Sequence, residues 1–292
     1  MDIRSGCRSV PELRFIPCSL CGGDDANSVA IHNGYRIVRC RGCGLVYVNP
    51  RPSEDDLSAL YADYHVRNGE NEVCWNKLMC GVFREAADHL GAMVDGSLRP
   101  RLLDVGCGYG GFIFLMRNRG WDAEGIDPSP LTVAAASVKG LPVRLGTLDG
   151  FPPSKTVYRA ITLFYVLEHL PDPMVALRKV FTLLEPGGAL VVRVPDTTPI
   201  VRLLSPVGLG MSLYDPPFHL CDFSPAVLHR MLIAAGFEKI RTFPGRNTVP
   251  SHIGPRMATM FFGAFARGVF VASGGRFLLP GVSKTTIARK PS

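Results

Sequence analysis

The clearest chemistry in this chain lies in a glycine-rich segment, Asp104-Val105-Gly106-Cys107-Gly108-Tyr109-Gly110-Gly111, followed by Glu124-Gly125-Ile126-Asp127. Glycines at 106, 108 and 111 satisfy the G-x-G-x-x-G pattern of dinucleotide sites, where backbone N–H groups and a helix N-terminus hold a pyrophosphate. Asp104 argues against that ligand, because a carboxylate two residues before the first glycine would repel phosphates. The same carboxylate suits a ligand with an ammonium group and no phosphate.

S-adenosylmethionine is such a ligand, because its methionine end carries an amine and its sulfonium is cationic. Asp127 closes a second apolar run and is placed to accept hydrogen bonds from ribose hydroxyls. Dinucleotide sites share that role, so Asp104 is the residue that discriminates between the two cofactors.

At these residues the chain resembles the class I S-adenosylmethionine-dependent methyltransferases. Leu167-Glu168-His169-Leu170-Pro171-Asp172-Pro173 and Leu184-Glu185-Pro186-Gly187-Gly188 look like the family's strand-four loop and its turn before strand five. The resemblance covers residues 98–240. It implies a doubly wound, mostly parallel, seven-stranded Rossmann-like α/β sheet and methyl transfer (EC 2.1.1.-). Tyr158-Arg159 departs from the Phe-Asp pair that relatives often have, so one family carboxylate is missing.

The resemblance also implies which residues hold the cofactor. Leu148 is expected to contact adenine through its backbone, with Asp149 near the adenine amino group. The full expected set is Asp104, Gly106, Cys107, Gly108, Gly110, Asp127, Pro128, Leu148, Asp149 and Tyr165.

Two histidines are the candidate catalytic residues, because a hydroxyl or acidic carbon acceptor needs a base to take its proton. His169 follows the expected fourth strand, and His219 lies in the long loop after the fifth. Imidazole titrates near neutrality, so either histidine can act as the base without a large pKa shift. The alternative for Glu168-His169 is a loop-shaping role, because this pair recurs in relatives with different acceptors.

Four cysteines near the N-terminus have metal-ligand spacing. Cys18-Ser19-Leu20-Cys21-Gly22 and Cys40-Arg41-Gly42-Cys43-Gly44 are two C-x-x-C-G units separated by 18 residues, within the range of a four-thiolate zinc site. Four cysteines fill a tetrahedral shell, so the expected zinc is structural rather than catalytic. The intervening segment predicts a hairpin turned at Asn33-Gly34. The pattern therefore predicts a zinc ribbon with ligands Cys18, Cys21, Cys40 and Cys43.

Ribbons of this kind precede methyltransferase domains in two groups. The run Cys43-Gly44-Leu45-Val46-Tyr47-Val48-Asn49-Pro50-Arg51-Pro52 is similar to bacterial sugar, polysaccharide and natural-product methyltransferases. The other group, ribosomal-RNA guanine methyltransferases, often has histidine as the last ligand, where this chain has Cys43. The first group fits better.

Composition sets broader limits. The 292 residues are 47% hydrophobic and 20% charged, which is ordinary for a soluble globular protein, with net charge +7. The basic residues are scattered without a long run, so a solvated basic surface explains them better than nucleic-acid binding, which stays the alternative. The N-terminus lacks the apolar core of a signal peptide and no stretch of about 18 apolar residues spans a membrane, so the expected location is cytoplasmic.

The elements that must position these residues follow from hydrophobic periodicity. Short apolar runs predict parallel strands near 101–105, 123–127, 143–146, 160–165 and 189–195, with an antiparallel edge at 238–243 and 284–289. Helices are expected near 75–94, 111–118, 129–138, 173–184 and 225–235. The expected domains are a zinc ribbon (1–50), a linker and helical lead-in (51–97) and the methyltransferase domain (98–292).

A hydrophobic insertion at about 250–280 interrupts the last domain. Its apolar part, 257–271, is too interrupted to span a bilayer and suits peripheral membrane contact, a dimer face or a cover over a greasy substrate. Packing back on its own domain is the commonest fate of such a stretch.

The sequence thus predicts an S-adenosylmethionine-dependent methyltransferase with a structural Zn²⁺. The expected acceptor is a small molecule or glycan, methylated on oxygen or carbon in sugar, polysaccharide or natural-product metabolism. An RNA base methyltransferase that grips RNA with its ribbon is the alternative, and a non-catalytic cofactor-binding or interaction protein is the third. Fold-level kinship does not identify the acceptor, and the sequence does not fix the oligomeric state.

Overall fold

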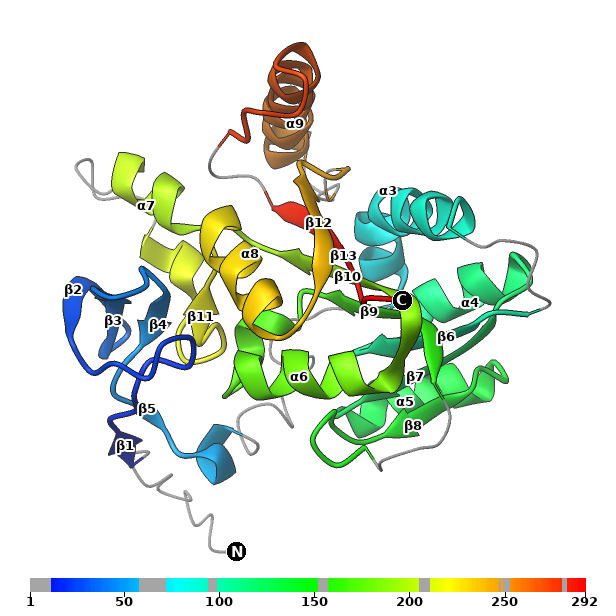
Figure 1. Cartoon of the computed structure of the whole chain (residues 1–292), viewed down its shortest axis with the longest axis horizontal. Helices are drawn as coiled ribbons and strands as arrows, with labels where there is room; N and C mark the ends of the chain where they lie inside the picture. Colours follow the sequence, from blue (N-terminus) through cyan, green and yellow to red (C-terminus); the bar gives the residue numbers. More distant parts are fainter. Residues whose placement is uncertain are drawn as a thin grey trace, which may run out of the picture.

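The computed structural model describes residues 12–57, 72–93, 99–151, 157–204, 211–246, 248, 253–279 and 283–292. Two bodies of β structure stand side by side, a small N-terminal sheet and a larger sheet with helices on both faces (Figure 1). Within the described residues, no helix is long and apolar enough to cross a membrane.

The larger sheet has seven strands in the order β12-β13-β10-β9-β6-β7-β8. The five neighbouring strands from β10 to β8 run parallel to one another, and β13 is antiparallel to both β10 and β12. This is the mostly parallel sheet with an antiparallel edge that the sequence predicts. Its strands are β6 (Arg101–Val105), β7 (Asp122–Asp127), β8 (Val143–Leu145), β9 (Tyr158–Phe164), β10 (Leu184–Val194), β12 (Glu238–Phe243) and β13 (Lys284–Arg289).

Helices cover both faces because side chains alternate along each buried strand. Leu190 and Val192 of β10 join the core with α6 (Pro173–Leu183) and α8 (Pro225–Ala234). Val191 joins the opposite core with α3 (Glu72–Gly91) and α4 (Gly111–Asn118). Further helices in the described part of the chain are α5 (Pro130–Val138), α7 (Thr198–Leu204), α9 (Ile253–Ala272) and the short 3₁₀ turns η1 (Leu167–His169) and η3 (Met211–Tyr214).

Three helices open with a side-chain cap followed by proline. Ser129, Asp172 and Ser224 accept hydrogen bonds from backbone N–H groups of the first turns of α5, α6 and α8. Proline is favoured at the first helical position because its missing N–H is one that the helix would leave unpaired. These caps determine the residue at which each of the three helices begins.

The N-terminal sheet is built around the expected hairpin. β2 (Ala26–His32) and β3 (Tyr35–Cys40) pair antiparallel around Asn33 and Gly34, which both have positive φ. β4 (Val46–Val48) extends this sheet, and β11 (Cys221–Asp222), which lies between β10 and α8 in the chain, completes it. β1 (Leu13–Arg14) pairs with β5 (Arg51–Pro52). The ribbon is therefore joined to the larger domain by a shared sheet.

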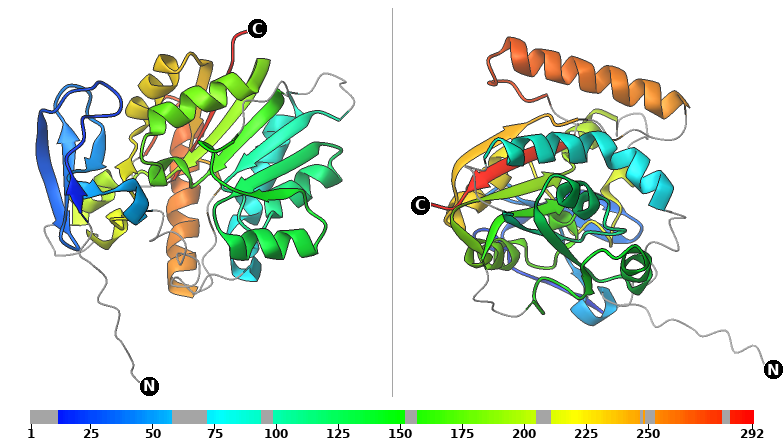
Figure 2. Two further views of the ribbon diagram at one scale, coloured as in Figure 1. Left: turned by 90° about the horizontal axis from the view of Figure 1, so that it is seen from below. Right: turned by 90° about the vertical axis from the view of Figure 1, so that its right-hand side faces the viewer.

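The hydrophobic insertion forms α9, which lies on the outside of the molecule. Figure 1 shows this helix above β12 and beside α3, and Figure 2 (right) shows it at the outer limit of the molecule. Among the described side chains of α9, Gly263 and Ala266 are buried, whereas Phe261 and Phe265 are exposed, so the insertion packs back on its domain through one side of the helix.

Candidate functional site

The glycine loop after β6 is bound tightly to β7. The backbone N–H groups of Gly106 and Cys107 both donate to the carbonyl of Ile126, at 2.8 and 3.1 Å. Gly106, Gly108 and Gly110 have φ of 66°, 52° and 76°, a region in which other residues are strained. A methyl group on Gly106 would lie 2.4 Å from Cγ2 of Val166. Glycine is thus required there twice, by backbone angle and by space.

Asp127 ends β7 beside this loop and is almost fully buried. One carboxylate oxygen accepts from Gly108 N at 2.8 Å, and the other accepts from Ser129 N at 3.0 Å and from the Thr132 hydroxyl at 2.7 Å. Three donors occupy three of the roughly four acceptor positions of a carboxylate. Asp127 therefore holds the loop in shape and keeps capacity for one further donor.

Asp104 lies inside β6 near its carboxyl end and is 2% exposed. Its Oδ1 accepts from the Thr162 hydroxyl of β9 at 2.6 Å. Burial, opposed by that hydrogen bond and reinforced by Asp127, raises the pKa of Asp104 to about 7. A cation at this carboxylate would restore the ionised form, because an adjacent positive charge favours it.

The other residues expected at the cofactor have different environments. Cys107 is buried, and the side chain of Leu148 is 3% exposed within the core between the sheet and α6. Pro128 and Asp149 are exposed. Tyr61 and Tyr64, which resemble a segment that approaches the cofactor in relatives, lie outside the described residues.

Tyr165 directly follows β9 with a positive φ of 58° and is held by a residue that sequence reasoning missed. Its hydroxyl accepts from Nε of Arg193, at 2.9 Å. Arg193 is 1% exposed and also donates to the Thr285 hydroxyl and the Arg246 carbonyl. The sequence did contain one sign of this role, an arginine within the apolar run of β10. A charged side chain buried in a strand needs hydrogen-bond partners, so a polar partner nearby could have been expected.

A second missed residue is Trp75, at the start of α3. A methyl group on Gly108 would lie 3.9 Å from its indole Nε1, so the ring stands over the glycine loop. Asn76 is beside it, and its buried Oδ1 has no hydrogen-bond partner among the described residues. The sequence offered only the amphipathic period of this helix, which does not say which residues meet the loop.

The two candidate catalytic histidines meet, although 50 residues separate them. Their rings are 4.8 Å apart between centroids in an edge-to-face arrangement. His169 Nδ1 lies 3.0 Å from the Phe218 carbonyl. An Nδ1–H that donates to this carbonyl leaves Nε2 as the acceptor nitrogen of His169. Burial lowers the pKa of His219, while Asp215 and Asp222 oppose that change.

Glu168 completes this cluster. It is fully buried, and neither carboxylate oxygen has a hydrogen-bond partner among the described residues. Burial raises the pKa of Glu168 to about 8. Donor atoms of Glu168, His169 and His219 all lie within 4.8 Å of one another. Two imidazoles and a largely protonated carboxyl group can accept and return a proton, and their spacing would also accommodate a divalent cation.

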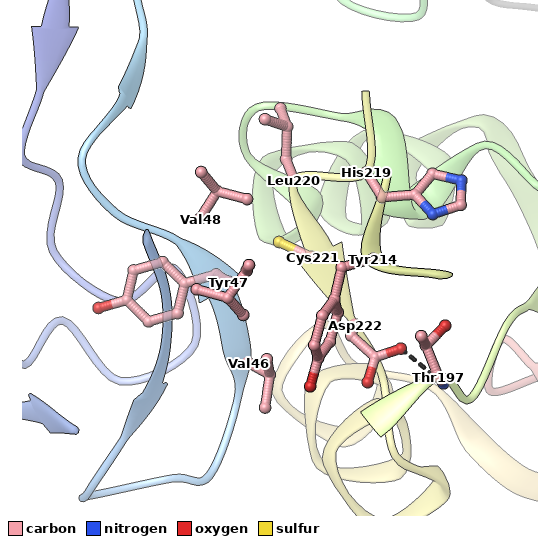
Figure 3. Close-up of a pocket in the computed structure, with 10 residues that line it drawn as sticks. Val46, Tyr47, Val48, Thr197, Tyr214, His219, Leu220, Cys221 and Asp222 are labelled. Atoms are coloured by element: carbon pink, nitrogen blue, oxygen red, sulfur yellow. Dashed lines mark hydrogen bonds between the residues drawn. The ribbon is translucent and has the colours of Figure 1, made fainter. Parts of the chain in front are cut away.

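His219 is positioned by the junction between the two sheets (Figure 3). Cys221 and Asp222, just after it, pair with Tyr47 and Val46 of the ribbon. Asp222 also accepts from the backbone N–H groups of Thr197 and Thr198, at 2.8 and 2.9 Å, which ties the start of α7 to β11. The ribbon thus packs against the loop that carries His219 and supports it from one side.

The four predicted zinc ligands converge. Their sulfur atoms all lie within 4.8 Å of one another, with Cys18–Cys43 at 3.3 Å and Cys21–Cys40 at 3.4 Å. A tetrahedral Zn²⁺ with Zn–S bonds of about 2.3 Å requires sulfurs about 3.8 Å apart, so the four thiols fit that ion. In both knuckles a backbone N–H after the second cysteine returns to the first cysteine's carbonyl, Gly22 to Cys18 and Gly44 to Cys40.

Comparisons with known proteins agree with this architecture. Residues 81–242 match the family model described as a methyltransferase domain. The chain is 31% identical over 169 residues to the ubiquinone biosynthesis O-methyltransferase of Psychrobacter arcticus, covering 53% of this chain and 65% of that protein. It is 31% identical over 166 residues to the same-named enzyme of Aeromonas salmonicida, covering 53% and 69%. The match thus spans about two thirds of these relatives.

Two solved structures share the fold. The CcbJ methyltransferase from Streptomyces caelestis superposes with a TM-score of 0.51 at 18% identity, covering 73% of this chain and 90% of CcbJ. The plantazolicin methyltransferase BpumL superposes with a TM-score of 0.51 at 16% identity, covering 82% and 92%. With the family match over more than half of its length, the chain belongs to the S-adenosylmethionine-dependent methyltransferases.

Proposed function

We propose that this protein transfers the methyl group of S-adenosylmethionine to a hydroxyl oxygen of a small-molecule or glycan acceptor. The observation that carries this proposal is the cluster of Glu168, His169 and His219 at the carboxyl end of β9. The named relatives are O-methyltransferases, which supports an oxygen rather than a carbon acceptor.

The cofactor side of the proposal assigns a role to each buried carboxylate. Asp104 accepts hydrogen bonds from the ammonium group, and Asp127 uses its remaining capacity for a ribose hydroxyl. Gly106, Cys107, Gly108 and Gly110 offer backbone atoms, while Pro128, Leu148, Asp149 and Tyr165 border the nucleoside. When bound, the cofactor supplies an electrophilic methyl group, so the protein mainly has to orient the acceptor oxygen in line with it.

The acceptor side uses the histidine pair as the base. Nε2 of His169 takes the hydroxyl proton as the oxygen attacks, and the neutral His219 beside it orients the acceptor. A protonated Glu168 is neutral, so it does not hold a negative charge next to the developing alkoxide. Base catalysis of this kind contributes roughly 10²–10⁴-fold in rate.

The cysteine set is proposed to hold a structural zinc ion. Cys18, Cys21, Cys40 and Cys43 would supply all four ligands, which leaves no coordination position for substrate. The ion would close the ribbon whose strand β4 supports β11, and so would keep His219 in place without taking part in methyl transfer.

The test measures cofactor binding and methyl transfer separately. Calorimetric titration of the zinc-loaded protein with S-adenosylmethionine is expected to show micromolar binding, with none for NADH. Transfer of a labelled methyl group to a panel of phenols, nucleotide sugars and oligosaccharides should then identify the acceptor class. His169→Gln should abolish transfer to the best acceptor but leave cofactor affinity unchanged. Labelling of RNA instead of the panel, or cofactor binding with no labelled product, would contradict the proposal.

A further inference from the structure

The outward face of α9 is apolar over its described length. On the side that faces the domain, Gly263 and Ala266 are buried. Among the side chains that the structure describes, the opposite face has no polar one, and Phe261 and Phe265 in it are 70% and 57% exposed. Phe262, outside this face, is 63% exposed. This exposed face consists of Met257, Met260, Phe261, Ala264, Phe265, Gly268, Val271 and Ala272.

The helix is nevertheless anchored to the domain. Phe270 packs against the core formed by α3 and α4, and Arg267 pairs with Glu85 of α3 at 3.2 Å. Small residues at 263 and 266 let α9 approach the surface closely. The inner face packs on the domain, whereas the outward face is exposed. Contiguous apolar patches of this kind mark interaction surfaces.

The charge around α9 identifies the partner. The segment 253–279, which includes α9, contains three arginines, Arg256, Arg267 and Arg276, and no Asp or Glu, and Arg267 is paired with Glu85. Arg276 follows the helix and is exposed. We propose that the outward face of α9 docks on an anionic lipid surface, with its phenylalanines among the acyl chains and its basic flanks at the headgroups. A second copy of the chain would bring the basic flanks of two α9 helices together, which disfavours it as the partner.

The position of α9 gives this docking a consequence. The insertion begins after Phe243, the last residue of β12, and ends before Lys284, the first residue of β13. Both residues lie at the side of the sheet where the parallel strands have their carboxyl ends. The carbonyl of Arg246, in the same insertion, accepts from Arg193, which holds Tyr165. Lipid docking would therefore set this edge near the membrane surface. Delivery of a membrane-bound acceptor there rests on the proposed function, whereas lipid binding itself does not.

The test uses sedimentation of the full chain with lipid vesicles. We expect binding to vesicles containing phosphatidylglycerol, weakened by salt, and much less binding to pure phosphatidylcholine. The double variant Phe261→Ser, Phe265→Ser should weaken binding by roughly tenfold or more, because two aromatic rings that would be buried in the lipid are removed. Arg276→Glu should weaken binding only to the anionic vesicles, by about fivefold or more.

A matched control separates this surface from general hydrophobicity. Phe114 of α4 is 59% exposed and lines a pocket with Tyr109 and Gly110 of the glycine loop, so Phe114→Ser should leave vesicle binding unchanged. Circular dichroism spectra should show that all variants are folded. Absence of vesicle binding, or equal binding to neutral vesicles, would overturn the proposal. A dimer in analytical ultracentrifugation that the Phe261/Phe265 variant breaks would overturn it too, by assigning the face to a second copy. No arm of the experiment depends on methyl transfer.

Discussion

The two halves of the candidate site satisfy their buried carboxylates in different ways. On the cofactor side, Asp127 receives three hydrogen bonds from residues within 20 positions of it, and Asp104 receives one from Thr162. On the acceptor side, Glu168 is fully buried with no hydrogen-bond partner among the described residues. Asp127 is thus fixed by hydrogen bonds before any ligand arrives and Asp104 has one such bond, whereas the burial of Glu168 is not offset by any hydrogen bond from the described residues and raises its pKa to about 8.

The largest expected effect is on the cofactor side. Asp104→Asn removes the carboxylate proposed to hold the ammonium group and should weaken S-adenosylmethionine binding by about 100-fold or more, since a charge-assisted bond in a buried site is lost. Calorimetric titration measures this change. The matched control is Asp122→Asn, an exposed residue at the start of β7, which should have no effect. Unchanged affinity in Asp104→Asn would contradict the assignment of Asp104 to the cofactor half of the site.

The next effect tests how rigid the glycine loop is. Gly106→Ala should destabilise the protein by about 2–4 kcal/mol, because it combines a positive φ with a clash against Val166. Gly140 has φ of 70° but no atom within 4 Å of an added methyl, so Gly140→Ala should cost only about 1 kcal/mol. Chemical denaturation of both variants measures the difference. Equal costs would show that the loop yields to the added methyl group.

The acceptor side should show its cost in the pH dependence of stability. The folded-state pKa of Glu168 is raised to about 8, so the folded protein binds a proton there that the unfolded chain releases near pH 4.5. Stability must therefore fall as pH rises through this window, and Glu168 alone should remove roughly 2–3 kcal/mol between pH 6 and 9. Glu168→Gln should reduce this loss in denaturation curves. A variant with the wild-type slope would show that Glu168 is not the source.

The smallest effect concerns the junction that positions His219. Asp222→Asn keeps the shape of the side chain but loses an acceptor for the N–H groups of Thr197 and Thr198, and should cost about 1–2 kcal/mol. Hydrogen exchange should rise at the start of α7 and in β11 but not in the glycine loop. Faster exchange in both places would mean that the two halves are coupled.

Some of the fold could be predicted because its signals are local. Strands β6, β7, β12 and β13 and the Asn33-Gly34 hairpin follow from residues adjacent in sequence. Other contacts had no such signal. The pairing of β11 with the ribbon joins residues more than 170 positions apart, and nothing in Cys221–Asp222 indicates a strand. Arg193 and Trp75 reach Tyr165 and the glycine loop only because separate elements pack together.

The sequence by itself determined the family, the type of sheet and the four-cysteine cluster, because each depends on residue types at short, fixed spacing along the chain. Only the tertiary structure decided that His169 and His219 share one site, that Glu168 is buried without a hydrogen-bond partner beside them, and that one face of α9 stays exposed. The physical reason is that burial and electrostatics are properties of packed surroundings. Those surroundings come from segments that are distant in the sequence.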